Sequence, residues 1–146
     1  MERRKFIKTC CFTAVGVSVA GLTLTSCDSV YYATATKILE RLIISKREFI
    51  RTKNEKQTER KFVLIKEDGL KYPLCLYKIS DDNYSASLLL CTHNGCELNV
   101  GGGRYTCPCH GAEFSVKGEV LQGPAEKNLK TFKTETDNEN VYIYLS

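Results

Sequence analysis

Histidine is scarce in this chain, which has only two among its 146 residues. The sequence shows no nucleophile paired with a base, no phosphate-binding loop and no iron-binding triad of two histidines and a carboxylate. A site that chemically transforms a substrate is therefore not indicated. Internal repeats and low-complexity tracts are also lacking, and the absence of tryptophan decides nothing.

Both histidines lie in two short boxes that also hold four of the eight cysteines. The boxes read Cys91-Thr92-His93-Asn94-Gly95-Cys96 and Cys107-Pro108-Cys109-His110-Gly111-Ala112. Four cysteines and two histidines suit a [2Fe–2S] centre in which two imidazoles replace two thiolates on one iron. On these boxes the chain resembles the Rieske iron–sulfur proteins of the disulfide-bearing, cytochrome bc-type subgroup, most strongly from about residue 88 to 125.

The resemblance implies which residues hold the single [2Fe–2S] cluster. Cys91 and Cys107 would ligate one iron, and His93 and His110 the other, more exposed iron. Neutral imidazoles make the cluster less negative, so its potential rises from about −400 mV in all-cysteine centres to roughly −150 to +300 mV. Because imidazoles lose protons near neutral pH, reduction is expected to couple to proton uptake.

The remaining two cysteines of the boxes, Cys96 and Cys109, form a disulfide in the subgroup that this chain resembles. Such a bridge would tie the two ligand loops together and shield the cluster. Disulfides persist in oxidising compartments, so the pair predicts export from the cytoplasm.

Three other uses of the boxes fit their spacing or composition less well. Zinc sites favour C-x2-C knuckles, whereas the spacings here are C-x-H and C-x-C-H. Covalent haem needs C-x-x-C-H, and the second box is one residue short of it. A plain disulfide framework leaves unexplained why both histidines fall inside the boxes.

The N-terminus independently favours export. Basic residues among positions 1–8 precede an uncharged stretch, Thr9 to Ser26, which reads as a signal peptide over residues 1–26. Arg3-Arg4 resembles a twin-arginine signal, and Leu24-Thr25-Ser26-Cys27 resembles a lipobox with lipidation at Cys27. The alternative is an uncleaved anchor helix, although the stretch is short and diluted by polar residues. Either reading places the protein in the bacterial cell envelope, exported and membrane-anchored, on the periplasmic or outer face of the inner membrane.

Most of the formal charge of +4 belongs to the signal, and about +1 remains without it, so nucleic acid is not an indicated partner. We expect a tether over residues 27–39 and a Rieske domain over 40–146, with a cluster-binding subdomain at 88–126. Residues 46–61 are rich in lysine and arginine. They are read as a solvated hairpin and loop, with attraction to anionic lipid or an acidic partner as the functional alternative.

Short β-like runs separated by turn signals predict an all-β fold, and the resemblance implies a Rieske-type antiparallel β-sandwich with a small cluster-binding subdomain. The expected strands begin at about Arg41 and continue at residues 61–66, 72–79, 84–90, 104–107, 113–115, 119–121, 129–134 and 140–145.

Several positions are expected to shape the cluster environment. In Rieske proteins a glycine–proline loop covers the cluster, and Gly123-Pro124 stands at that place. Quinol-oxidising Rieske subunits usually carry serine at the position of Ala112 and tyrosine at that of Phe114, and their hydroxyls stabilise the reduced cluster. Both are missing here, which predicts an intermediate potential below ubiquinol-type values. Asn94 stands where such subunits often place leucine.

The function expected from this resemblance is one-electron transfer, without substrate chemistry of its own. The chain would be a membrane-tethered carrier or a subunit of a respiratory quinol:cytochrome c-type or related oxidoreductase. Its partners would be a membrane-bound quinol-oxidising complex or a cytochrome c-type acceptor. Both histidines are committed, so the second iron centre of a Rieske oxygenase cannot be built. The alternative is a non-enzymatic structural or sensory iron–sulfur binding module.

Overall fold

A computed structural model of the chain describes residues 30–146. The predicted signal peptide over 1–26, its Arg3-Arg4 pair and the lipidation site Cys27 all lie outside the described residues. Within residues 30–146, no helix has the length and apolar character needed to cross a membrane.

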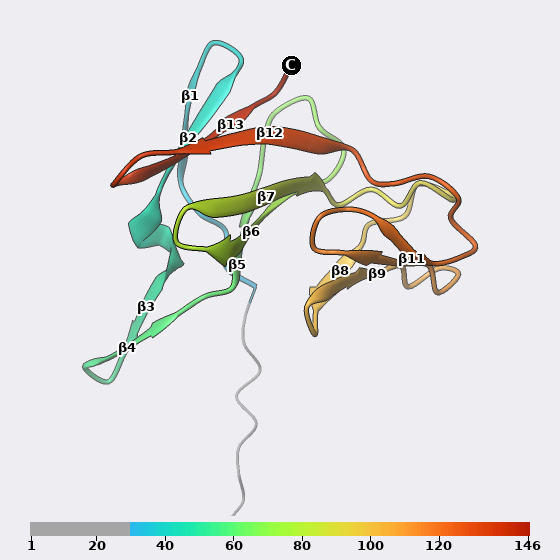
Figure 1. The fold of residues 1–146 in the computed structure, drawn as a ribbon, viewed down its shortest axis with the longest axis horizontal. Coiled ribbons are helices and arrows are strands. Elements are labelled where there is room, and N and C mark those ends of the chain that lie inside the picture. The colour runs from blue at the N-terminus through green and yellow to red at the C-terminus, as the bar shows by residue number, and fades with distance from the viewer. Residues whose placement is uncertain (1–29) are drawn as a thin grey trace, which may run out of the picture.

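The body of the fold is a sheet of seven antiparallel strands (Figure 1). In spatial order they are β1 (Ala35–Ile38), β2 (Arg41–Ser45), β13 (Asn140–Tyr144), β12 (Thr131–Thr136), β7 (Asn83–Leu88), β6 (Leu74–Ser80) and β5 (Phe62–Ile65). Alternating side chains explain the pairing of β2 with β13. Leu42 and Ile44 are buried opposite Ile143 and Val141, and all four belong to the core under the sheet.

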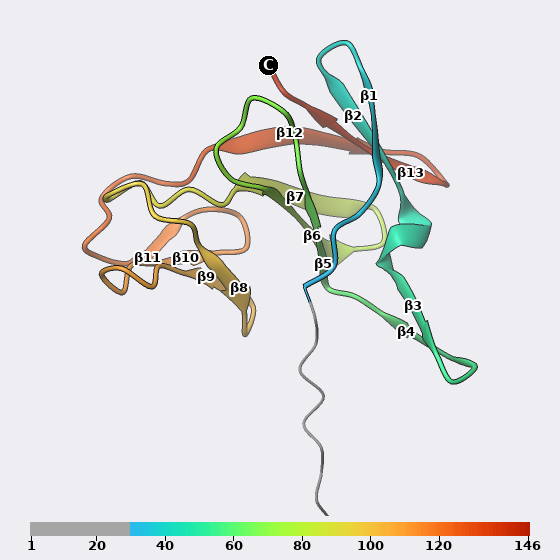
Figure 2. The same cartoon turned by 180° about the vertical axis from the view of Figure 1, so that it is seen from behind.

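A second antiparallel sheet lies at one end of the long axis of the molecule (Figures 1 and 2). Its order is β11 (Val120–Gln122), β10 (Glu113–Ser115), β9 (Arg104–Thr106) and β8 (Asn99–Gly101). This sheet has its own core, in which Tyr105 and Phe114 are fully buried opposite each other on β9 and β10. Both ligand boxes border this second core, because Cys91 and Cys107 are members of it.

Residues 46–61 leave the body as a short 3-10 helix η1 (Lys46–Phe49) and a hairpin of β3 (Ile50–Lys53) and β4 (Lys56–Glu59). This confirms the predicted hairpin. Phe49 is buried at the base, where its ring packs edge-on against Tyr84 at 5.4 Å between ring centroids. At the tip, Asn54 and Glu55 both have positive φ, which matches the twist of a two-residue hairpin turn.

The predicted all-β, antiparallel architecture is confirmed, and the expected strands occur with ends that match or are shifted by one to a few residues. The predicted tether over 27–39 needs correction. Tyr32 bridges to Leu64, the Ala33 amide donates to the Leu64 carbonyl, and residues 35–38 form β1. Ala33 and Ala35 pack against the main core, so small side chains that suggested a tether instead allow close packing. Residues 32–38 therefore belong to the folded body.

Candidate metal centre

The first box, between β7 and β8, forms a tight loop closed by its own backbone. The Gly95 amide donates to the Cys91 carbonyl at 2.8 Å, and the Cys91 amide donates to the Cys96 carbonyl at 2.8 Å. Gly95 has φ of 71°, a left-handed conformation that glycine adopts without steric cost. These bonds fix the Cys91 side chain against the second core while the residues between remain at the surface.

The second box, between β9 and β10, repeats that hydrogen-bond pattern. The Gly111 amide donates to the Cys107 carbonyl at 3.0 Å, and the Cys107 amide donates to the Ala112 carbonyl at 2.8 Å. Gly111 has φ of 76°. Because the donors and acceptors occupy the same offsets in both boxes, the two loops share one backbone design and present their first cysteines in equivalent ways.

The side chains of Cys91 and Cys107 are buried free thiols, 2% and 3% exposed. They hydrogen-bond each other, and each sulfur also accepts the backbone amides two and three positions further along its loop. Burial raises the pKa of Cys91. Burial also acts to raise the pKa of Cys107, but the hydrogen bonds from Cys91 and the loop amides outweigh it and lower that pKa. Metals bind the thiolate, so these amide donors favour the ligating form.

His93 and His110 come from different loops yet lie side by side at the surface. Their ring centroids are 4.9 Å apart and their planes meet at 86°. Both residues are exposed, in contrast to the buried thiols. The site therefore has an inner pair of sulfur donors and an outer pair of imidazoles.

Cys96 and Cys109 form a disulfide across the two loops, with their Cα atoms 6.6 Å apart. This is the pairing that the family resemblance implied. The two sulfurs lie within 4.8 Å of each other and of the Cys107 sulfur, so the bridge packs directly against one thiol. The disulfide thus limits how far the two loops can separate.

The end of β11 and the segment after it are hydrogen-bonded to the two loops. The Gln122 side chain donates from Nε2 to the Gly111 carbonyl at 3.3 Å, and the Thr92 hydroxyl donates to the Lys127 carbonyl at 2.6 Å. Gly123-Pro124 lies between these two attachment points in the sequence. Sequence reasoning missed Thr92 and Gln122, because each bonds a backbone carbonyl and such partners leave no sequence pattern.

Ala112 and Phe114 are both fully buried directly after the second loop. Neither side chain carries a hydrogen-bond donor. The nearby hydroxyl of Tyr105, opposite Phe114, donates to the Val116 carbonyl at 3.4 Å. Asn94 is exposed in the first loop, directly after His93 in the sequence.

The donor set fits a [2Fe–2S] cluster with mixed ligands. Two adjacent, buried, amide-bonded sulfurs suit one iron, and two adjacent exposed imidazoles suit the second. Fold and donors together define an iron–sulfur protein in which cysteine and histidine share the ligation. All four predicted ligands are brought to one end of the second sheet, together with the disulfide.

The chain belongs to the Rieske [2Fe–2S] domain family, whose model matches residues 46–133. That range includes the hairpin, both boxes and Gly123-Pro124. The chain therefore binds a [2Fe–2S] cluster, and the chemistry of the domain is one-electron transfer through it.

Relatives of known role share only part of their length with this chain. The cytochrome b6-f complex iron–sulfur subunit of Synechococcus strain RCC307 is 38% identical over 56 residues, covering 37% of this chain and 32% of the relative. That of strain JA-2-3B'a(2-13) is 39% identical over 61 residues, covering 40% and 35%. The chain thus matches about a third of the length of these relatives.

Among solved structures, the chain is similar to the plasma membrane Rieske protein PetC3 of Synechocystis PCC 6803. The two share 35% identity with a TM-score of 0.50, and the match covers 57% of this chain and 85% of the other. This likeness supports the Rieske fold of the described residues.

Proposed function

We propose that this chain is a membrane-tethered electron carrier, or the equivalent subunit, of a quinol:cytochrome c-type or related oxidoreductase. The observation that carries the proposal is the pair of matched loops, with two buried thiols inside and two exposed imidazoles outside. Such a site holds the cluster through its buried thiols and contacts a redox partner through its exposed imidazoles. When bound, the cluster accepts and releases one electron at a time.

Each residue has a separate role in the proposal. Cys91 and Cys107 hold the inner iron, and the loop amides stabilise their thiolates. His93 and His110 hold the outer iron, and their exposed edges form the contact with a donor or acceptor. The Cys96–Cys109 disulfide and the segment around Gly123-Pro124 exclude water from the inner side of the site.

The partner and location are inferred from the relatives and the N-terminal sequence. Matched relatives are iron–sulfur subunits of cytochrome b6-f complexes, and one similar structure is a plasma membrane protein. We infer a quinol-oxidising partner and attachment to the membrane through a lipid at Cys27 or an anchor helix. The apolar side chains at 112 and 114 favour a potential below ubiquinol-type values, which suits a menaquinol-level or other low-potential donor.

The test is a redox titration of the full-length holoprotein followed by low-temperature EPR at several pH values. We expect a rhombic Rieske-type signal with an intermediate midpoint potential that falls as pH rises, because the reduced form takes up protons. Reduced protein should pass its electron to a cytochrome c-type acceptor within a catalytic turnover. A cluster that exchanges electrons with no quinol or cytochrome would overturn the carrier role.

Ligand variants test the assignment. Cys91→Ser and His110→Ala should each abolish the rhombic signal while the protein remains folded by circular dichroism. Cys75→Ala is the matched control, because Cys75 is a third buried free thiol on β6. An unaltered signal in either ligand variant, or loss of the signal in the control alone, contradicts the assignment.

A further inference from the structure

Charge is divided unevenly along this chain. Residues 46–61 contain seven basic and three acidic residues, a formal excess of four positive charges. Residues 62–146 contain eight basic and eleven acidic residues, a formal excess of three negative charges. The hairpin region is therefore the positive pole of a domain whose remainder is acidic, and such a field orients a protein near a charged surface.

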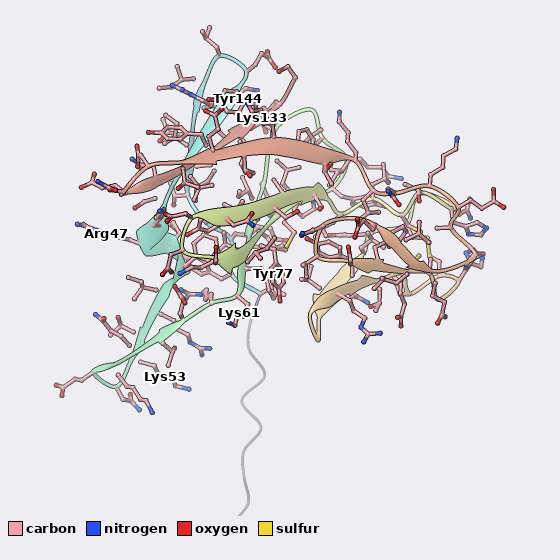
Figure 3. The ribbon with its side chains drawn as sticks, viewed as in Figure 1. Arg47, Lys53, Lys61, Tyr77, Lys133 and Tyr144 are labelled. Atoms are coloured by element: carbon pink, nitrogen blue, oxygen red, sulfur yellow. A yellow bond between two sulfur atoms is a disulfide. The ribbon has the colours of Figure 1, made fainter. Side chains whose placement is uncertain are left out.

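Two lysines at the tip of the hairpin are available for binding. Lys53 and Lys56 pair across its tip, both are exposed, and neither has an acidic ion-pair partner among residues 30–146. One of the acids, Glu59, is instead paired with Lys78 on the body. Figure 3 shows Lys53 at the tip of the hairpin, pointing away from both sheets.

Apolar side chains adjoin this charge where the described chain begins. Val30 and Tyr31 line a groove together with Arg51 and Arg60 of the hairpin region. Val30 is 59% exposed, and Ile50 at the base of the hairpin is 46% exposed. The Arg60 guanidinium stacks on the Tyr31 ring at 3.9 Å, which fixes the first residues against the hairpin.

The position of this basic and apolar surface indicates that it faces a membrane. The residues before Val30 include the long uncharged stretch Thr9 to Ser26, so the membrane-directed part of the sequence joins the fold at this groove. The hairpin projects toward the same lower edge of the molecule at which the described chain begins (Figures 1 and 2). Lysines, arginines and exposed aliphatic or aromatic side chains together are the composition that binds an anionic lipid surface.

We propose that the β3–β4 hairpin and the groove beside Val30 dock on an anionic phospholipid bilayer. The hairpin and the cluster loops lie at opposite ends of the long axis (Figure 1). Docking through the hairpin therefore leaves His93 and His110 uncovered and fixes how the site is presented to a partner. The proposal rests on the membrane tether proposed above, which the same samples test separately.

Because the chain contains no tryptophan, a single introduced tryptophan reports its own contact with lipid. Full-length holoprotein carrying Gln57→Trp on β4 is reconstituted in vesicles with brominated acyl chains. The vesicles are phosphatidylcholine alone, or phosphatidylcholine and phosphatidylglycerol in equal parts. The control reporter is Ile38→Trp, at a residue that is 48% exposed. It belongs to β1, a strand at the upper edge in both ribbon views.

We expect bromine quenching of Gln57→Trp only in the phosphatidylglycerol vesicles, and no headgroup dependence for Ile38→Trp. Each basic residue near an anionic surface contributes about fivefold to the contact equilibrium. Lys53→Gln with Lys56→Gln should therefore weaken the contact about 30-fold, whereas Lys117→Gln with Lys130→Gln should leave it unchanged. Added salt should release the hairpin, because exposed charges are screened beyond about 10 Å at 0.1 M.

Quenching that ignores the headgroup, or equal effects of the two lysine pairs, would overturn the proposal. A hairpin that serves an acidic protein instead would show no quenching in either vesicle. Vesicle flotation reports the tether and EPR reports the cluster, so failure of the proposed function is distinguishable from failure of the docking surface.

Discussion

Restoring two hydroxyls beside the candidate cluster should raise its midpoint potential. The variants are Ala112→Ser and Phe114→Tyr, at two side chains that are fully buried immediately after the second ligand loop. Reduction adds negative charge to the cluster and its sulfurs, so a hydrogen-bond donor there stabilises the reduced form more than the oxidised form. The present alanine and phenylalanine supply no such donor.

The size of the effect follows from hydrogen-bond energies. A hydrogen bond to a charged group contributes about 1.5–3 kcal/mol, and only the difference between the two redox states moves the potential. If about half of that energy is lost on oxidation, each hydroxyl stabilises the reduced form by about 1 kcal/mol. For a one-electron couple this equals ~40 mV, so the double variant should lie roughly 80 mV above the wild type. Inserting atoms into a packed core also costs roughly 1–3 kcal/mol of stability.

The assay is an EPR-monitored redox titration of the holoprotein at fixed pH, with thermal unfolding measured in parallel. Tyr105→Phe is the matched control, because it removes a buried hydroxyl of the same core that donates to the Val116 carbonyl. The control should destabilise the fold and leave the midpoint unchanged. A midpoint that stays constant or falls in the intact double variant refutes the argument from missing donors.

Cys96→Ser removes the disulfide, so the cluster should be lost faster to a chelator and have a lower potential, measured by absorbance decay and titration. Thr92→Val removes the hydroxyl that donates to the Lys127 carbonyl and should speed chelator access several-fold without moving EPR line positions. The Tyr142 hydroxyl and backbone amides lower the pKa of Asp137 to about 2. Its ionised form therefore stabilises the fold above the unfolded pKa near 3.8, and this is lost as pH falls through about 2. Asp137→Asn should unfold more readily than wild type at neutral pH, and the two should converge in acid.

Much of the fold was predictable because its strands alternate in the expected way. In β10 only Phe114 is buried between two partly exposed neighbours, and the strand was predicted with its observed ends. The strand expected from about Arg41 is β2, which the local pattern left ambiguous with a helix and which was favoured because the following residues are β-like. The candidate ligands were likewise predicted, because residue types and their spacing can be read directly from the sequence.

Other parts depended on contacts that have no sequence pattern. Strand β1 is largely exposed and short, so its formation rests on pairing with β2 rather than on burial. Strand β8 was also missed, since Gly101 and two exposed or partly exposed neighbours show no hydrophobic alternation. The attachment of Lys127 to the first loop was missed for a related reason, because a hydroxyl such as that of Thr92 can bond any carbonyl that the tertiary fold brings near.

The two loops share one backbone arrangement, and their few differences explain why we expect the second loop to adjust the midpoint potential of the cluster. The fifth position after the first cysteine is Cys96 in one loop and Ala112 in the other, and the first is already used by the disulfide. The seventh positions, Leu98 and Phe114, are both buried in the second core. The backbone thus holds the first cysteines in the same way in both loops, whereas the fifth position is free to carry a hydrogen-bond donor only in the second loop. A change in potential can therefore evolve at Ala112 without disturbing the disulfide or the four ligands.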